Sequence, residues 1–457
     1  MKAGYPSPEQ MPNFAANPRV LVVTRGSAGD VHPYLAVALA LAARGVRTGL
    51  ITNPYFRETI ERSGIDFFPM GDPLPPQDRL VGRPQLVRRV RGTFAWLELL
   101  GGAAAEVVPA VDRAIDEFRP DLIFGHHLCL GGPEIASKRG VEWWTGMLAP
   151  VACMSVQQPV VFPIGLDTSG HSSAVRRIQN LCTRTTVNAM VDARTVRACA
   201  AHGVSASRDV FFGGMLGHPS IAMFSPALRA PAQDDPEGMR IVGFPWPERK
   251  DAWGELDPEV RSFLDDGTPP VVAAMGSMYS GAMAPTNARV VEACRSLGER
   301  AIVVGGLPSG FSLQRGELQV ARAPYSGLFA RAAAVVHHGG VGTAAFAMRH
   351  GVPVVVTPIG LDQFDIGARI ARMGLGVVVL PRSGPRRFAR ALDRVLHDEG
   401  VRNRAGVVRR IVEREDGASA AAEVLVGRLV GRDRSLSPVM RSTRPRSPVS
   451  SGNPVPG

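Results

Sequence analysis

Residues 334–376 read AVVHHGGVGTAAFAMRHGVPVVVTPIGLDQFDIGARIARMGLG and hold two strand–turn–helix units in succession. The apolar run Ala334–Val336 predicts a buried strand, which breaks into histidines and glycines before a helix over Ala344–His350. A second apolar strand, Val354–Thr357, is followed by the pair Asp362–Gln363, which opens another helix. Buried strands that alternate with helices predict an α/β fold with a parallel sheet.

The glycine turn of this stretch is suited to an anion. Glycines let backbone N–H groups approach a ligand, and the dipole of the following helix favours negative charge. A histidine in the turn adds a donor, and Asp362–Gln363 adds hydrogen-bonding groups after the next strand. These groups together suit a sugar joined to a diphosphate. The plainer interpretation is a strand–turn–helix in an α/β sheet, where a glycine-rich turn needs no ligand.

HHGGVGT (337–343) followed by PIGLDQ (358–363) resembles the donor-site signature of the inverting, nucleotide-sugar-dependent GT-B glycosyltransferases. These include the antibiotic and lipid glycosyltransferases of bacteria (family 1 and family 28 types) and the UDP-glycosyltransferases of plants and animals. The resemblance implies two facing Rossmann-like domains, with His338 on the donor diphosphate and Asp362 and Gln363 on the sugar. The implied donor-binding set is Ser277, His338, Gly339, Gly340, Gly342, Thr343, Asp362 and Gln363.

The N-terminal region predicts a second doubly wound sheet. A buried strand over Arg19–Thr24 is followed by a loop, a helix over Pro33–Ala43 and another strand, Val46–Thr52. The loop carries only G-x-x-G, which falls short of the G-x-G-x-x-G fingerprint, so no NAD site is predicted. The segment GSAGDVHPYLAVALALAARG (26–45) is similar to the first strand–loop–helix of the same enzymes, especially the bacterial rhamnosyltransferase-like members.

That second resemblance implies a general base at Asp30, because the bacterial antibiotic enzymes have an aspartate there. A positioned carboxylate can take the proton of an acceptor hydroxyl as it attacks the anomeric carbon. The alternative for Asp30 is a helix cap. His32 could serve as the base instead, although a packing role or one beside the phosphates fits its helical position better.

Acceptor-side residues are expected where strands end in the first domain. His126 follows the strand Asp121–Phe124, at a point where plant members often carry an aspartate, so that catalytic dyad is absent or altered. His126 could face the acceptor or assist Asp30, and the plainer interpretation is a simple strand-end histidine. Trp144 and Met147 precede a proline-broken stretch, residues 150–170, that should line the acceptor pocket. Its apolar content favours a hydrophobic acceptor.

Length and composition predict two domains. A chain of 457 residues with 45% hydrophobic and 20% charged residues is globular and too long for one core. The best linker candidate is PALRAPAQDDPEG (226–238). The predicted bounds are 1–17 for a disordered arm, 18–232 for the acceptor-binding domain, 233–430 for the donor-binding domain and 431–457 for a disordered tail.

The net charge of +11 would ordinarily suggest nucleic acid or a membrane. Part of the excess lies in the tail, and lysine occurs only at positions 2, 138 and 250, so the charge is almost all arginine. That pattern is typical of a GC-rich bacterial genome, and no nucleic-acid module is recognisable. Five cysteines without a C-x-x-C predict neither a disulfide framework nor a zinc site.

Neither a signal peptide nor a membrane span is recognisable, so a cytoplasmic protein is expected, as a monomer or homodimer. The basic and apolar stretch from Arg79 to Leu100 could dock on a membrane surface, but an ordinary amphipathic helix explains it better.

Two absences narrow the mechanism. No lysine follows Lys250, whereas retaining GT-B enzymes and glycogen phosphorylase-like proteins use one, and no D-x-D triplet is present for a metal of the GT-A kind. The expectation is an inverting transfer of a hexose or deoxyhexose from a UDP- or dTDP-sugar to a small hydrophobic natural product or lipid, without metal or cofactor. A non-catalytic GT-B helper protein and a nucleotide-sugar epimerase remain the alternatives.

Overall fold

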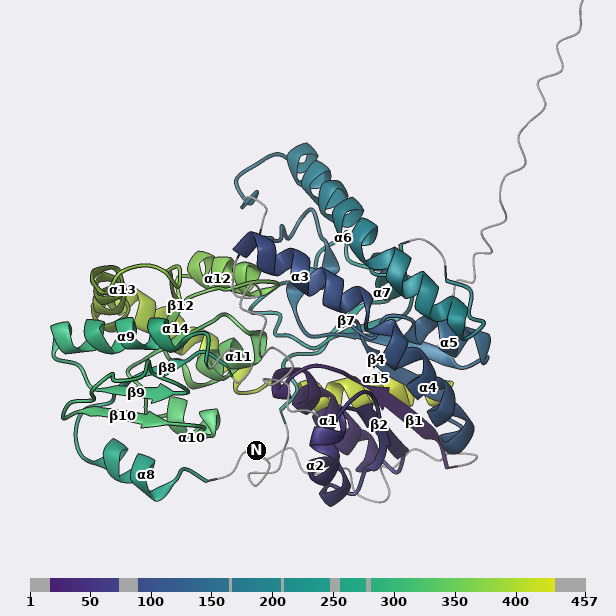
Figure 1. The fold of residues 1–457 in the computed structure, drawn as a ribbon, viewed down its shortest axis with the longest axis horizontal. Coiled ribbons are helices and arrows are strands. Elements are labelled where there is room, and N and C mark those ends of the chain that lie inside the picture. The colour runs from purple at the N-terminus through teal and green to yellow at the C-terminus, as the bar shows by residue number, and fades with distance from the viewer. Residues whose placement is uncertain are drawn as a thin grey trace, which may run out of the picture.

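The computed structural model describes residues 17–73, 89–163, 167–206, 209–246, 255–276 and 281–431. The predicted disordered arm and tail lie outside these ranges apart from their border residues. So do Ser277 and the part of the basic stretch that contains Arg79. The described residues form two lobes, each built on a parallel sheet (Figure 1).

The first lobe contains a seven-stranded sheet in the order β3-β2-β1-β4-β5-β6-β7. Its strands are β1 (Arg19–Val23), β2 (Arg47–Thr52), β3 (Asp66–Pro69), β4 (Leu122–His126), β5 (Glu142–Met147), β6 (Ser220–Ala222) and β7 (Arg240–Ile241). Its helices are α1 (Ala28–Ala42), η2 (Pro54–Phe56), α2 (Arg57–Arg62), α3 (Arg89–Gly101), α4 (Ala104–Phe118), α5 (Gly132–Lys138), η5 (Pro150–Cys153), α6 (Ser173–Ala201) and α7 (Phe212–Leu216).

The second lobe contains a six-stranded sheet in the order β10-β9-β8-β11-β12-β13. Its strands are β8 (Val271–Ala274), β9 (Ala301–Val304), β10 (Glu317–Val320), β11 (Ala334–His337), β12 (Val354–Val356) and β13 (Gly376–Val378). Its helices are α8 (Pro258–Asp265), α9 (Ala284–Leu297), α10 (Tyr325–Phe329), α11 (Val341–His350), α12 (Gln363–Arg372), α13 (Pro385–His397), α14 (Glu399–Val412) and α15 (Gly417–Leu429).

The central strands are buried on both faces, as their continuous apolar runs predict. Val20–Val23 of β1 and Val354–Val356 of β12 are buried along their whole length. Every pairing in both sheets is parallel, so the strands need crossover helices, which cover the two faces. The carboxyl ends of the strands in each sheet therefore lie along one edge, where ligands of such sheets bind.

The boundary between the lobes lies later than predicted. β7 pairs with β6 in parallel, with Ile221 opposite Arg240, so residues 240–241 belong to the first sheet. The predicted start of the second domain at residue 233 is therefore wrong for this strand. The reason is that Met239–Ile241 reads as the start of a new apolar strand, while its pairing partner is 19 residues earlier, in β6. Residues 226–238, which we continue to call the linker, connect β6 to β7 within the first lobe.

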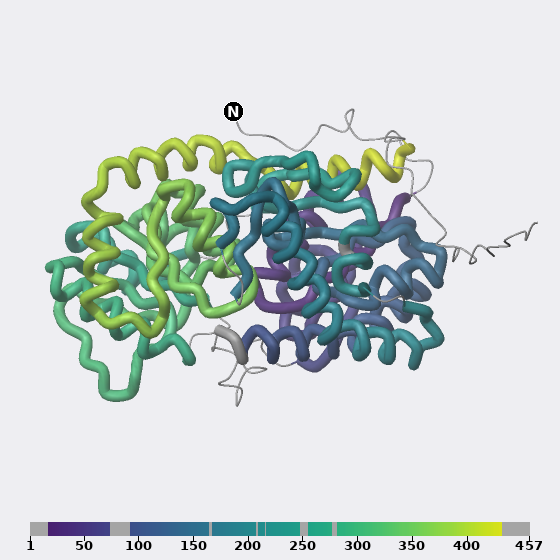
Figure 2. The backbone as a smooth tube through the Cα atoms, turned by 90° about the horizontal axis from the view of Figure 1, so that it is seen from above, coloured from purple at the N-terminus to yellow at the C-terminus, as the bar shows by residue number. Residues whose placement is uncertain are grey.

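The last helix, α15, returns to the first lobe, as Figure 2 shows for the yellow end of the tube. Ala421, Ala422, Leu425 and Val426 are buried in one cluster with residues of β1, α1 and β5. Arg428 forms an ion pair with Glu142 of β5, with Nε 3.0 Å from the carboxylate. Glu415, just before α15, accepts a hydrogen bond from the Phe244 N–H, so the two chain crossings between the lobes lie side by side.

One stretch, Gly92–Phe118, is long and apolar enough to cross a membrane by length and composition. It contains most of α3 and all of α4, which the turn at Gly102–Ala103 separates. Val107, Val111 and Phe118 of α4 pack in the core of the first lobe. The apolar character of this stretch is therefore explained by burial under the first sheet.

Candidate active site

Asp30 lies in the first turn of α1, directly after β1. Its Oδ2 accepts hydrogen bonds from the backbone N–H of Ser27 at 2.7 Å and from the Ser27 hydroxyl at 3.1 Å. Ser27 is the N-cap of α1, so the helix begins five residues earlier than predicted. Asp30 therefore reaches back to cap the helix, and the capping interpretation and the base interpretation are both compatible with its position.

The environment of Asp30 makes it a stronger base than an ordinary carboxylate. Burial raises its pKa to about 6, although the two Ser27 hydrogen bonds and the charge of Arg25 act in the opposite direction. Gly26 is required beside it, because φ is +128° there and a Cβ would lie 2.2 Å from Oδ2. At neutral pH the carboxyl is mostly ionised and able to accept a proton.

Asp362, the N-cap of α12 in the second lobe, faces the same region. Burial raises its pKa to about 7, and the negative charge of Asp30 adds to this effect, followed by that of Asp365. Two carboxylates from different lobes are thus close enough to repel each other, which favours a shared proton at the pair. Val341 at the start of α11 also packs against both lobes. The predicted base and the predicted sugar-binding residue therefore meet between the lobes.

His338 is held by close packing in the β11–α11 loop. A Cβ on Gly340 would lie 2.5 Å from its Nε2, and one on Gly276 would lie 2.7 Å from its Cε1. Only glycine on both sides leaves space for the ring. Burial lowers the pKa of His338 to about 4, partly offset by a hydrogen bond with the Ala274 backbone. The ring is therefore neutral at pH 7 and has a single N–H, which it donates to the Ala274 backbone.

The neighbouring His337 has a different role. It is fully buried, and its Nδ1 accepts a hydrogen bond from the Gly339 N–H at 3.1 Å. Gly339 has φ of +95°, and a Cβ there would lie 2.8 Å from the Gln363 carbonyl oxygen. His337 thus stabilises the turn that brings α11 and α12 together. Of the two adjacent histidines, His338 is the one wedged in the glycine turn, as expected.

Gln363 stabilises the loop before α12 through hydrogen bonds. Its Oε1 accepts hydrogen bonds from the backbone N–H groups of Ile359 (2.8 Å) and Gly360 (3.2 Å), and its side chain is buried. Leu361 in this loop has φ of +51°, a conformation that non-glycine residues seldom adopt. The amide oxygen of Gln363 is therefore committed to the backbone. A contact with the sugar remains a prediction for its nitrogen.

Gly342 and Thr343 lie in the first turn of α11. A Cβ on Gly342 would meet no atom within 4 Å, so packing does not explain this glycine, and the space is open to a ligand. Thr343 is buried. Ser277 lies outside the described residues, and the adjacent Gly276 packs against the His338 ring.

Two of the acceptor-side predictions are wrong. Trp144 is fully buried and donates its Nε1–H to Glu142, and Met147 is fully buried in the core. Both belong to β5, a central strand covered by helices on both faces, so neither side chain can face a ligand in this conformation.

The two histidines predicted on the acceptor side are both buried and packed against aromatic rings. His126 is 1% exposed, its ring centroid lies 5.2 Å from that of Tyr34, and it bonds to the Arg25 backbone. This bond to Arg25 thus stabilises the β1–α1 loop. His32 packs its ring edge against Phe56 at 6.3 Å, and burial lowers its pKa. The packing role suggested for His32 agrees with this contact.

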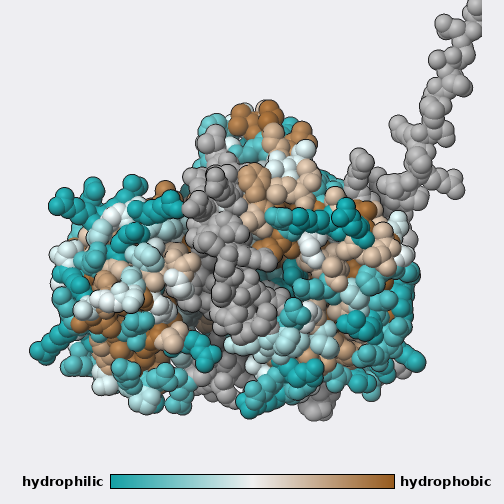
Figure 3. All heavy atoms as spheres, in the orientation of Figure 1, coloured by the Kyte–Doolittle hydropathy of each residue, from teal (hydrophilic) through white to brown (hydrophobic). Residues whose placement is uncertain are grey.

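A hollow of about 320 Å³ lies beside the loop that follows β5. We call residues 148–163 the β5 loop. The hollow is lined by side chains from this loop and from α6, α7 and the linker. Six are apolar (Cys153, Met154, Leu181, Phe212, Leu216 and Pro236) and three are polar or charged (Asn180, Arg184 and Asp234). The helix α6 rises from the body here, and hydrophobic residues gather at its free end (Figures 1 and 3). Val175, Ile178 and Leu181 are exposed on it.

Family models match both lobes. The glycosyltransferase family 28 N-terminal domain matches residues 20–116, and the erythromycin biosynthesis protein CIII-like C-terminal domain matches residues 308–425. The chain is 30% identical to glycosyltransferase GtfE of Amycolatopsis orientalis, over 92% of this chain and 100% of that relative. It belongs to the GT-B glycosyltransferases.

Further members of this GT-B family support the assignment. The O-mycaminosyltylonolide 6-deoxyallosyltransferase of Streptomyces fradiae is 30% identical, over 89% of this chain and 96% of the relative. The crystal structure of the glycosyltransferase VinC in complex with DTDP has a TM-score of 0.63 at 20% identity, covering 91% of this chain and 100% of that one. The two-lobed GT-B fold expected from the sequence is confirmed.

Proposed function

We propose that this glycosyltransferase moves a hexose or deoxyhexose from a UDP- or dTDP-sugar to a hydroxyl of a small hydrophobic natural product or lipid, with inversion. The observation that carries the proposal is the meeting of Asp30 and Asp362 between the lobes. A sugar held by Asp362 would present its anomeric carbon to an acceptor hydroxyl beside Asp30. The names of the 6-deoxyallosyltransferase and of the DTDP complex support a deoxyhexose and a dTDP donor among these choices.

In the proposed reaction, Asp30 takes the proton of the acceptor hydroxyl while the hydroxyl oxygen bonds to the anomeric carbon. The bond from that carbon to the diphosphate oxygen breaks on the opposite face, and the nucleoside diphosphate leaves with the bonding electrons. The free amides at the start of α11 would bind the developing negative charge, and the N–H of neutral His338 would join them by exchanging the Ala274 carbonyl for a diphosphate oxygen. The absence of a D-x-D triplet supports a reaction without metal.

The β5 loop and the hollow beside it support the acceptor class. An aglycone with apolar rings would bury part of its surface against Met154, Leu181 and Phe212. A cytoplasmic location is part of this proposal, since nucleotide sugars are made there.

A thermal-shift panel of UDP, dTDP, GDP and NAD, with wild type and His338→Ala, tests the donor site. We expect UDP or dTDP to raise the melting temperature of wild type and to have a much smaller effect on the variant. If none of the four ligands stabilises wild type, the donor assignment is wrong. Once a nucleotide is identified, transfer from its sugars to a macrolide aglycone and to a sterol would identify the acceptor class.

A further inference from the structure

Two buried charged residues of α12 have no part in the proposed reaction. Asp365 and Arg369 are 0% and 4% exposed, and Arg369 Nε donates to Asp365 Oδ2 at 2.8 Å. They lie one turn apart on the helix that begins with the predicted sugar-binding residues. Burying two charges costs desolvation energy, which good geometry and further hydrogen bonds must offset.

The further hydrogen bonds of this pair go to the other lobe. Asp365 Oδ1 accepts from the backbone N–H of Val161 at 3.1 Å. One terminal nitrogen of Arg369 lies 3.4 Å from the Gln158 carbonyl oxygen and 3.5 Å from that of Pro159. The pair therefore satisfies three backbone groups of the β5 loop, which belongs to the first lobe.

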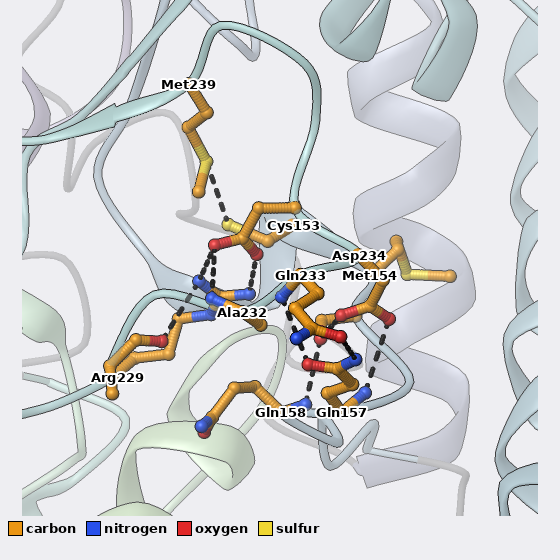
Figure 4. A network of polar contacts seen from close by, with 12 residues as sticks. Cys153, Met154, Gln157, Gln158, Arg229, Ala232, Gln233, Asp234 and Met239 are labelled. Carbon is orange, nitrogen blue, oxygen red and sulfur yellow. Dashed lines mark hydrogen bonds and ion pairs between the residues drawn. The ribbon is translucent and has the colours of Figure 1, made fainter.

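The opposite side of the β5 loop is tied to the linker (Figure 4). The Asp234 carboxylate accepts from the Ser155 hydroxyl at 2.7 Å and from the Gln157 N–H at 3.2 Å. The loop is thus clamped between the linker and α12, and its residues Cys153 and Met154 line the apolar hollow.

We propose that Asp365 and Arg369 are positioning residues that fix the β5 loop to the donor-sugar helix and so set the acceptor site. We call this pair the α12 brace. The proposal rests on the proposed function, because it assumes that the acceptor binds beside this loop. It follows that loss of the brace weakens the use of the acceptor and leaves binding of the nucleotide unchanged, because the hydrogen bonds that the brace makes outside the pair go to the β5 loop.

The test is the double variant Asp365→Leu/Arg369→Met, which removes both charges together. A buried pair replaced by apolar residues of similar size need not lose stability, whereas a single replacement would leave an unpaired buried charge. We expect the KM for the acceptor to rise at least tenfold, while the affinity for the nucleoside diphosphate changes less than twofold. The matched control is Arg409→Met/Glu413→Leu, which removes an exposed pair of the same spacing on α14 and should change neither constant.

A second variant reaches the same contact from the loop. Val161→Pro removes the N–H that Asp365 accepts and leaves α12 intact, so it should raise the acceptor KM as well. If the double variant does not fold, Val161→Pro alone tests whether the contact between the brace and the β5 loop sets the acceptor KM. An unchanged acceptor KM would overturn the proposal, and so would acceptor and nucleotide constants that weaken together.

A wild-type protein that transfers no sugar would contradict the proposed function, and the brace would still be tested by amide exchange. With the brace in place, the Val161 N–H should exchange slowly, and it should exchange at least tenfold faster in the double variant. Equal exchange rates would overturn the brace independently of catalysis.

Discussion

The two loops that meet between the lobes hold their reactive side chains by different physical means. In the β1–α1 loop, hydrogen bonds from Ser27 hold Asp30. In the β11–α11 loop, two glycines leave a slot for His338, and packing holds the ring. Hydrogen bonds from Ser27 lower the pKa of Asp30 and so adjust it, whereas the packing around His338 fixes the position of its ring. The proposed base is therefore tunable, and the histidine proposed to bind the diphosphate is held in place.

The largest effect should come from removing the base. Asp30→Asn keeps the size of the side chain and an oxygen that can accept from Ser27, but it cannot take a proton. We expect kcat to fall about 10²–10⁴-fold, the usual contribution of a general base. Nucleoside diphosphate affinity, measured by calorimetry, should stay within about twofold. Normal turnover by this variant would show that another residue is the base.

The packing around His338 can be disrupted without mutating the histidine itself. In Gly340→Ala the new Cβ would lie 2.5 Å from Nε2, so the ring must leave its position. A hydrogen bond to a charged group is worth about 1.5–3 kcal/mol, so donor affinity should fall roughly 10–100-fold. Calorimetric titration with the nucleoside diphosphate measures this. Gly406→Ala on α14, where a Cβ meets nothing within 4 Å, is the control and should bind normally.

The ionisation of Asp30, the tunable proposed base, should appear as an acid limb in the pH profile of kcat/KM. Burial raises the pKa of Asp30 to about 6, and the base works only when ionised, so kcat/KM for the acceptor should fall as pH decreases through 6. Below that value the loss should approach tenfold per pH unit. Asp30→Asn should lack this limb. His338 adds none between pH 5 and 8, because its pKa is about 4. A wild-type profile that is flat from pH 5 to 8 would contradict the assignment.

The smallest effect is expected from mutating Ser27, the hydrogen-bond partner of Asp30. Ser27→Ala removes the hydroxyl that donates to Asp30 and leaves the backbone N–H in place. Because both hydrogen bonds lower the pKa of Asp30, the acid limb should move upward by about half to one pH unit. The pH profile of the variant measures this shift. A downward shift would show that the hydroxyl does not stabilise the carboxylate.

The two strand–turn–helix units proposed to bind the donor were predictable as structure because their geometry is local in sequence. A strand, a glycine turn and a helix are consecutive residues, so the His338 turn and the α12 N-terminus could be identified together. The acceptor side depends on contacts between distant segments. Trp144 and Met147 were misplaced because a central parallel strand is buried on both faces, so residues near its end still pack under helices.

Two other features had weak or misleading signals. β7 has two residues and depends on its pairing with β6, which no periodicity can show. Asp365 and Arg369 have the i, i+4 spacing of an ordinary exposed helix pair, and only the fold shows that they are buried against the β5 loop. Ser27 and Asp30, in contrast, form an S-x-x-D pattern that could have placed the start of α1 correctly.

The return of α15 to the first lobe determines how this enzyme can be recombined with a relative. A hybrid joined only between β7 and α8 would place α15 of one parent against α1 of the other. Ala421 and Leu425 would then pack against a foreign surface, and a poorly filled core position of this kind costs about 2–5 kcal/mol. The exchangeable module is therefore the first lobe together with residues 417–429, two pieces of chain that must be inherited from the same parent.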